Sequence, residues 1–192
     1  MADSCGASPV SLPEFMARLT QALETANVPY MICGSVASFF HGVPRTTQDV
    51  DLVVQLTGFD VPRLLQCLPD DDFYVSESAA LDAVRSQRQF NVIDMQTGWK
   101  ADLIIKKRRP FSRLEFDRRV KVALMGVEVW VASAEDTVLS KLEWASAAGS
   151  ERQIRDAAGI VQVRGDGLDV AYLREWAAEL GVSTVLEELL AS

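Results

Sequence analysis

A chain of 192 residues, 48% hydrophobic and 24% charged, fits one folded domain with at most a small appendage, and this composition excludes a disordered protein. The net charge of −8 argues against indiscriminate nucleic-acid binding over the whole surface. No apolar run reaches the roughly 18 residues that a membrane-spanning helix needs, so we expect no membrane partner.

The first ten residues and the cysteines bear on the compartment. Residues 1–10 lack a basic segment followed by an apolar one, so we interpret them as a mobile tail rather than a secretory signal. Cys5, Cys33 and Cys67 are widely spaced and form no C-x-x-C pair. This spacing argues against a zinc site or a disulfide framework and predicts a cytoplasmic protein.

The chain opens with a predicted helix over residues 12–26, because Ser11 and Glu14 form a capping box before apolar residues at helical spacing. A short apolar strand is predicted at 28–32. Gly34-Ser35 then turns the chain into a helical stretch at 36–40, and the second strand covers 49–56. Residues 60–68 and 78–86 are predicted either as amphipathic helices or as irregular segments that cover the core.

Two hairpins follow. Residues 90–96 and 99–105 are β-rich runs around Thr97-Gly98, and residues 120–124 and 127–131 flank Met125-Gly126. The rest is helical, with predicted starts at Ser133, Ser150, Asp169 and Ser183. We therefore predict an α/β core at 11–132 and a helical subdomain at 133–192.

The second strand begins with two acids. Side chains alternate along a strand, so Asp49 and Asp51 point to the same side, where like charges destabilise each other unless a cation lies between them. Hard carboxylate oxygens suit Mg²⁺ or Mn²⁺. The alternative is a solvated strand end without metal, because D-x-D alone is a weak motif.

A third carboxylate would strengthen a metal site, and the first hairpin offers Asp94 and Asp102. A two-residue loop would pair Ile93 with Asp102 and Asp94 with Ala101, so that the two acids face opposite sides. A one-residue slip would change this. We favour Asp102 because it is enclosed in an apolar strand.

The Gly34-Ser35 turn joins a strand to a helix. Free backbone N–H groups and a hydroxyl at a helix start can hold phosphate, although Gly-Ser can equally be an ordinary cap. Arg45, Thr47 and the acid pair come directly afterwards. We call the Gly34-Ser35 turn the cradle. A phosphate-binding cradle, a cation and metal ligands are together what binding of a nucleoside triphosphate requires.

Charge is concentrated between Lys106 and Lys121. This stretch contains eight basic residues and two acidic ones, Glu115 and Asp117, so its net charge is +6. Because the whole chain has a net charge of −8, the remaining residues carry −14. The stretch is either a solvated loop and helix or a local phosphate-binding face. His41 is interpreted as structural, and Asp156 as either a helix-surface acid or a site residue.

Together, Gly34-Ser35, Asp49-x-Asp51 and Asp102 resemble the signature of the polymerase-β-like nucleotidyltransferase superfamily. The segment "HGVPRTTQDVDLVV" is similar to that of AbiEii-type and related minimal nucleotidyltransferases, and "ASAEDTVLSKLEWA" and "RQIRDAAGI" resemble their later helices. The resemblance covers about residues 28 to 163. Gly159 departs from it, because many relatives have an acid there.

The resemblance implies an α+β fold: a small mixed β-sheet nucleotidyltransferase core with flanking helices and a C-terminal helical segment. It implies that Asp49, Asp51 and Asp102 bind two metal ions, with Asp102 also helping to activate the acceptor hydroxyl. Residues implied to bind the nucleotide are Gly34, Ser35, Arg45, Thr47 and Lys141, of which Gly34 and Ser35 hold the β- and γ-phosphates.

We therefore predict a Mg²⁺- or Mn²⁺-dependent enzyme that transfers a nucleoside monophosphate from a nucleoside triphosphate to an acceptor hydroxyl, releasing pyrophosphate. The acceptor is a tRNA, a protein or a small molecule, and the basic stretch slightly favours tRNA. A toxin acting beside an antitoxin partner is one form of this prediction. The alternative is a non-catalytic, antitoxin-like binding partner, against which the intact acid triad weighs.

Overall fold

The computed structural model describes residues 11–47 and 49–191, so the predicted tail at 1–10 lies outside the described residues. The strands within these ranges are β1 (Tyr30–Cys33), β2 (Asp49–Val54), β3 (Phe73–Val75), β4 (Gln89–Asp94), β5 (Lys100–Ile105), β6 (Val120–Leu124) and β7 (Val127–Val131). The α-helices are α1 (Leu12–Thr25), α2 (Gly34–His41), α3 (Val61–Gln66), α4 (Glu77–Ser86), α5 (Pro110–Asp117), α6 (Ala134–Ala148), α7 (Glu151–Arg164), α8 (Val170–Leu180) and α9 (Ser183–Leu190).

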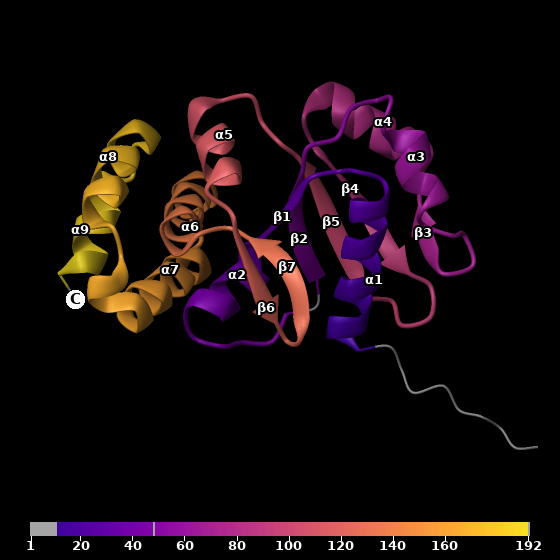
Figure 1. The fold of residues 1–192 in the computed structure, drawn as a ribbon. Helices are drawn as coiled ribbons and strands as arrows, with labels where there is room; N and C mark the ends of the chain where they lie inside the picture. Colours follow the sequence, from indigo (N-terminus) through magenta and orange to yellow (C-terminus); the bar gives the residue numbers. More distant parts are fainter. Residues whose placement is uncertain (1–10, 48, 192) are drawn as a thin grey trace, which may run out of the picture.

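The strands form one mixed sheet in the order β3-β4-β5-β2-β1-β7-β6. β2 runs antiparallel to β1 and parallel to β5, so these three strands lie in the middle of the sheet. The helices lie on both sides of it: α1, α3 and α4 on one, and α5 to α9 on the other (Figure 1). The predicted α+β class, with a mixed sheet and C-terminal helices, is confirmed.

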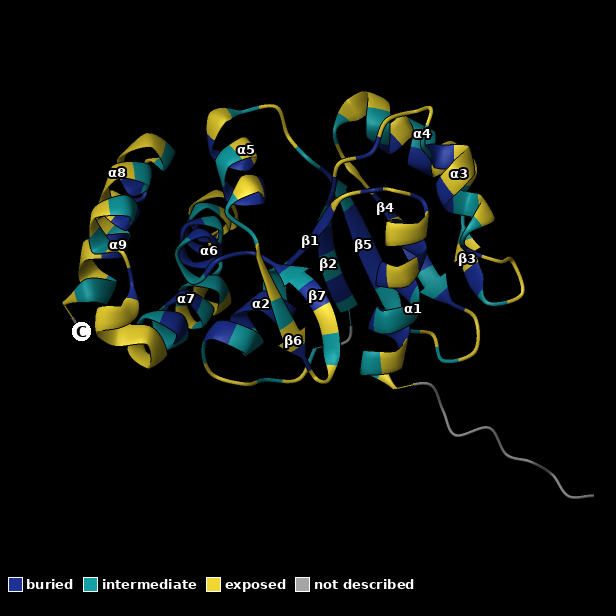
Figure 2. Cartoon of the chain, viewed as in Figure 1, coloured by how far each residue is buried: buried dark blue, intermediate teal, exposed yellow. Residues whose placement is uncertain are grey.

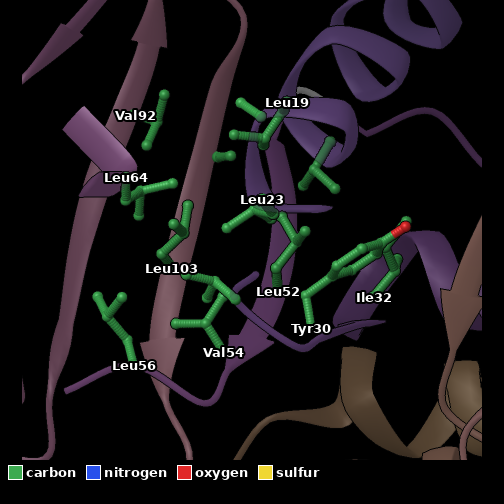
Figure 3. Packing of buried hydrophobic residues seen from close by; sticks show 14 of the residues in the cluster. Leu19, Leu23, Tyr30, Ile32, Leu52, Val54, Leu56, Leu64, Val92 and Leu103 are labelled. Carbon is green, nitrogen blue, oxygen red and sulfur yellow. The ribbon is translucent and has the colours of Figure 1, made fainter. Parts of the chain in front are cut away.

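The sheet has one apolar face and one partly polar face. Val50, Leu52 and Val54 on β2 are fully buried, whereas Asp49 and Asp51 alternate with them and are only partly buried. Leucines from α1 and α3 pack onto the apolar face over β2 and β5 (Figure 3). The hydrophobic burial of this core leaves the acids on the opposite face, toward α6 and α7.

A second hydrophobic cluster joins α6, α7, α8 and α9, and it includes Phe111 from α5. Figure 2 shows buried residues along the inner sides of these helices and exposed ones on their outer sides. None of the helices in the described part of the chain is long and apolar enough to cross a membrane.

Local signals in the sequence predicted most of these elements. The capping box of Ser11 and Glu14 is present, and the side chains of Ser133 and Asp169 cap α6 and α8 as predicted. Both hairpins form. The short strand β3 was not predicted, because three residues give little periodicity to detect, and α5 was predicted only as a helix without bounds within the basic stretch.

The predicted register of the first hairpin was wrong. Asp102 pairs with Asn91 rather than Ile93, because the loop is longer than two residues: the Asp94 carboxylate accepts the backbone N–H groups of Gln96 and Thr97. The error is two residues, which preserves the face of each side chain. Asp94 therefore does point away from Asp102, and it lies fully buried with Arg18 as its ion-pair partner.

Candidate functional site

A cavity of about 450 Å³ lies between the polar face of the sheet and the helices α5, α6 and α7. Its lining includes six of the eight predicted site residues, namely Gly34, Ser35, Asp49, Asp51, Asp102 and Lys141. Arg45 and Thr47 do not line this cavity but a smaller one beside it. The structure thus brings together the predicted metal ligands, the predicted cradle and the predicted lysine.

Strand pairing places the carboxylates. β2 and β5 are parallel neighbours in which Asp51 is directly opposite Asp102, and directly paired residues share a face. Asp49 lies two residues before Asp51 on the same face, opposite Lys100. The Thr47 hydroxyl donates to the backbone carbonyl of Asp49, 3.0 Å away, which holds the chain at the start of β2.

Asp102 is a buried acid with incomplete hydrogen bonding. It is 8% exposed, and its Oδ2 accepts only a long bond of 3.4 Å from Gln89. The Lys100 ammonium lies 3.1 Å from Oδ1, but the angle does not fit a hydrogen bond, so that buried oxygen accepts none from the described residues. A buried carboxylate in this condition favours a bound cation.

The pKa of Asp51 shows the electrostatic effect of placing three carboxylates on one face of the sheet. Burial raises the pKa of its carboxyl, and the charges of Asp49 and Asp102 raise it further, against the opposing effects of Lys141 and the backbone N–H of Ser35. Three acids on one face therefore repel each other. A divalent cation among them would lower the pKa again and stabilise all three charges.

The donor set fits Mg²⁺ or Mn²⁺, which prefer carboxylate oxygens, and the unbonded Oδ1 of Asp102 is a ligand of this kind. The three carboxylates are not drawn together as a closed ligand cage, however. Within residues 11–47 and 49–191, no three His, Cys, Asp or Glu side chains are grouped closely enough to hold a metal ion. Lys100 beside Asp102 supplies part of the positive charge instead.

Gly34 allows the cradle and the carboxylates to meet. It has φ +61°, and a Cβ atom there would stand 2.0 Å from Asp51 Oδ2. Any side chain at this position would displace the Asp51 carboxylate. The Gly-Ser turn therefore brings the start of α2 directly against the acids of β2.

Asp156 on α7 is the anchor for both predicted nucleotide-binding cations. Its carboxylate accepts two hydrogen bonds of 3.0 Å from the Arg45 guanidinium and one of 2.8 Å from Lys141 Nζ. Arg45 also donates to the Ser35 hydroxyl. Burial acts to raise the pKa of Asp156, but these donors hold it below its ordinary value. Asp156 does not line the cavity, but it is linked to Ser35 in the cradle through Arg45 and to the cavity through Lys141, so it is not a free acid on the helix surface.

The departure at Gly159 has a packing explanation. A Cβ atom there would lie 3.3 Å from Val43 Cγ2, and a Cβ on Gly42 would lie 2.9 Å from the backbone nitrogen of Ile160. The loop after α2 thus touches the α7 backbone closely. A longer acidic side chain at position 159 would meet this loop.

His41 has the structural role that was predicted. Its ring is buried, with Nε2 2.7 Å from the Ala132 carbonyl and Nδ1 2.8 Å from Arg164 of α7. Burial and the neighbouring Arg164 lower its pKa, so the neutral ring is favoured.

Three of the eight cations in the basic stretch at 106–121 form ion pairs with acids among the described residues. Arg109 forms a two-bond ion pair with Glu143, Arg118 pairs with Asp136, and Lys121 pairs with Glu128. Three exposed cations, Lys107, Arg108 and Arg113, form no ion pair with other described residues, and Lys107 lines the cavity. Of these three cations only Lys107 could meet a phosphate in the cavity itself, because neither Arg108 nor Arg113 lines it.

Several solved structures are similar to this one. The antibiotic-resistance factor ANT(2'')-Ia superposes with a TM-score of 0.59 at 17% identity, covering 94% of this chain and 97% of that one. A nucleotidyltransferase-like protein from Paracoccidioides brasiliensis gives 0.58 at 20%, covering 94% and 95%. The lincosamide antibiotic adenylyltransferase LnuA gives 0.53 at 13%, covering 81% and 99%.

This chain has a nucleotidyltransferase fold. At these identities the likeness is one of architecture, and it agrees with the resemblance to the polymerase-β-like superfamily. The narrower assignment to the AbiEii-type group stays a prediction. No protein-family model matches the sequence, and no curated protein matches it.

Proposed function

We propose that this protein is a divalent-metal-dependent nucleotidyltransferase, which transfers a nucleoside monophosphate from a nucleoside triphosphate to an acceptor hydroxyl and releases pyrophosphate. The observation that carries the proposal is the register of β2 and β5, which sets Asp51 opposite Asp102 with Gly34 in contact range of Asp51. The nucleotidyltransferase fold supports it.

The residues around the cavity would have different roles in the reaction. Asp49, Asp51 and Asp102 would hold the metal ions, which supply Lewis-acid stabilisation of the phosphoryl oxygens. The backbone N–H groups at the start of α2 and the Ser35 hydroxyl would bind the β- and γ-phosphates. Asp102 would orient the acceptor hydroxyl, and Lys141, which lines the cavity, would contact the nucleotide.

Arg45 and Thr47 would act from outside the main cavity, because they line the smaller one. Arg45 reaches the Ser35 hydroxyl, so it would position the cradle and add positive charge beside the phosphates. Thr47 fixes the start of β2 through Asp49. Both residues would therefore affect nucleotide binding without lining the main cavity.

The test is transfer of label from α-³²P-labelled nucleoside triphosphates with Mg²⁺ into any component of a cell extract. We expect Asp51→Asn and Asp102→Asn to reduce labelling by at least a hundredfold. The folded state should be kept, because each change relieves repulsion among three acids and the one ion pair lost, between Asp102 and Lys100, involves a partly exposed lysine. Asp82→Asn on the exposed surface of α4 is the matched control. Equal labelling by wild type and Asp51→Asn would refute metal-dependent transfer, and binding of a triphosphate without any labelling would favour the non-catalytic alternative.

A small hydroxyl compound is the acceptor class that the cavity favours. The structure of ANT(2'')-Ia in complex with adenylyl-2''-tobramycin shows that protein with a nucleotidylated antibiotic. Here the cavity lies between the sheet and three helices. It is lined by six carboxylates and four cations, which are Asp49, Asp51, Asp102, Glu115, Asp136 and Glu143, and Lys107, Arg109, Lys141 and Arg152. Metal ions would offset this acidic excess for a bound triphosphate, but the excess disfavours a second polyanion, such as a nucleic-acid acceptor, deep in the cavity.

A tRNA acceptor, with or without a toxin role and an antitoxin partner, is a second candidate. Exposed Lys107, Arg108 and Arg113 beside the cavity favour it, since they are free to meet phosphates outside the cavity. Purified tRNA in the labelling assay separates the two candidates. Labelled tRNA together with growth arrest on expression would support a toxin, and a labelled small molecule with no labelled tRNA would exclude it.

A further inference from the structure

Trp144 on α6 is set apart from the other three tryptophans of the chain. Trp99 and Trp130 pack against the cluster over the sheet, and Trp176 packs against the cluster of the C-terminal helices. Trp144 belongs to neither of these clusters of described residues, is 59% exposed and lines the cavity. A single exposed aromatic residue is common on a protein surface, so its surroundings decide what it can bind.

Gln153 on α7 has a polar atom without a partner. Its side-chain Oε1 is buried and accepts no hydrogen bond from the described residues, and Gln153 lines the same cavity as Trp144. A buried acceptor without a donor is destabilising unless a water or a ligand supplies one. The side-chain amide also carries an NH₂ donor beside this acceptor, so it can pair with a donor and an acceptor that lie side by side.

Trp144 and Gln153 lie at the same level of the α6–α7 hairpin. Only residues 149–150 separate the two helices, and so short a loop joins antiparallel helices. The bond from Lys141 Nζ to Asp156 marks one level of the hairpin. Trp144 comes three residues after Lys141, and Gln153 comes three residues before Asp156. Because residues three apart share a side of a helix, both lie one turn nearer the connecting loop on the cavity side.

This level of the hairpin is at the outer end of the cavity. The segment before α6 lies beside the cradle, since the Ala132 N–H donates to the carbonyl of Ile32 at the end of β1. Along the side of α6 that lines the cavity, Lys141 is buried whereas Trp144 is exposed. The cavity therefore extends from the cradle and the strand acids, past Lys141, to Trp144 at its mouth.

Lys141 connects this level with the metal site. Its ammonium lowers the pKa of Asp51, so the two side chains are within electrostatic reach of each other. Trp144 is three residues further along α6, a rise of about 4.5 Å. In a nucleotide, a ribose separates the base from the α-phosphate. A nucleotide with its phosphates at the cradle and at Asp51 would thus have its base beside Trp144.

We propose that Trp144 and Gln153 form a nucleobase subsite, an assignment that rests on the proposed use of a nucleoside triphosphate. The indole ring stacks on the base. Gln153 Oε1 accepts a hydrogen bond from an exocyclic amino group, and its NH₂ group donates to the neighbouring ring nitrogen. Adenine and cytosine present this pair, whereas guanine O6 and uracil O4 are acceptors that would face Oε1. The protein therefore prefers ATP and CTP to GTP and UTP.

The stacking contact is tested by equilibrium binding, which needs no transfer. Calorimetry with Mg²⁺ compares α,β-methylene-ATP, which cannot be cleaved at that bridge, with inorganic tripolyphosphate, which has no base. We expect Trp144→Ala to weaken binding of the analogue by about 5- to 150-fold and to leave tripolyphosphate binding unchanged. Trp144→Phe, which keeps an aromatic ring, should restore part of the affinity. Tyr74→Ala is the matched control, because Tyr74 is 57% exposed and lies on the edge strand β3.

The edge contact is tested by competition of the four nucleoside triphosphates against the bound analogue. We expect the wild type to bind ATP and CTP about 5- to 150-fold more tightly than GTP and UTP. Gln153→Leu, which keeps the size of the side chain, should abolish this difference and leave tripolyphosphate binding unchanged. Gln162→Leu, on the exposed surface of α7, should keep the difference.

The binding results separate the subsite from the transfer reaction. Equal weakening of the analogue and of tripolyphosphate by Trp144→Ala, or wild-type affinity for both, overturns the stacking contact. Equal affinity of the wild type for all four triphosphates overturns the edge contact. The predicted base-dependent binding without any labelling by the wild type supports the subsite and refutes the transfer. Wild-type labelling together with unchanged analogue binding by Trp144→Ala supports the transfer and refutes the subsite.

Discussion

At the scale of single residues, Gly34 carries the tightest constraint in the site. Its φ of +61° and the 2.0 Å that would separate a Cβ from Asp51 Oδ2 are two separate demands for glycine. Sequence alone suggested a turn here. The structure adds that the missing side chain is the space that the Asp51 carboxylate occupies.

We predict that Gly34→Ala costs more stability than Gly98→Ala and abolishes nucleotide binding. Gly98 also has a positive φ, +74°, but a Cβ there would meet nothing within 4 Å, so this variant pays only about 1–2 kcal/mol of backbone strain. Gly34→Ala should cost about 1–3 kcal/mol more for the clash. Urea unfolding of both variants measures the difference, and equal losses would show that Asp51 moves aside freely.

At the scale of elements, α7 is fastened to the cradle by Asp156. The bonds from Arg45 and Lys141 join residues 111 and 15 positions apart, so α6, α7 and the loop after α2 meet at one carboxylate. Arg164, at the other end of α7, donates to the backbone carbonyl of His41. The helix is held against α2 at two points about two turns apart.

We predict that Asp156→Asn destabilises the fold by about 3 kcal/mol, because it leaves the buried Lys141 ammonium without its anionic partner. Asp82→Asn is the control, since the exposed pair of Asp82 with Arg85 should contribute less than about 1 kcal/mol. Because the folded pKa of Asp156 is low, its contribution is present above about pH 4 and is lost as the pH falls through the folded pKa. A variant as stable as wild type at pH 7 would contradict this account.

At the scale of the whole molecule, the cavity lies where two hydrophobic clusters meet. One cluster fills the space between the sheet and α1, α3 and α4, and the other joins α6 to α9. Neither cluster contains the site. Asp49, Asp51 and Asp102 come from the sheet, whereas Ser140 and Lys141 come from α6. The loop after α2 contacts the backbone of α7, which carries the Asp156 partner of Lys141.

We predict that Gly42→Ala weakens this contact. Its Cβ would lie 2.9 Å from the backbone nitrogen of Ile160 and 3.0 Å from the carbonyl carbon of Gly159, and backbone atoms cannot rotate away. Overpacking of this kind costs about 1–3 kcal/mol, and the labelling rate should fall with stability because α7 carries Asp156. Gly58→Ala, which meets nothing within 4 Å, should be close to neutral in both measurements. If Gly42→Ala had the stability and labelling rate of the wild type, α7 would be able to shift without affecting either, which would contradict this prediction.

Short-range patterns in the sequence were sufficient for most elements and for the chemical character of the site. Alternation placed Asp49 and Asp51 on one face of β2, the capping residues predicted the starts of α1, α6 and α8, and Gly34-Ser35 predicted a strand-to-helix turn. These signals depend on neighbours within about four residues, where backbone geometry and hydrogen bonding are fixed locally.

Only the tertiary structure decided which distant residues meet. The pairing of Asp51 with Asp102, the joint binding of Arg45 and Lys141 by Asp156, and the neutralisation of Arg109 by Glu143 all join elements far apart in the chain. Such contacts result from how helices and strands bury their apolar faces against each other, and no local spacing encodes that choice.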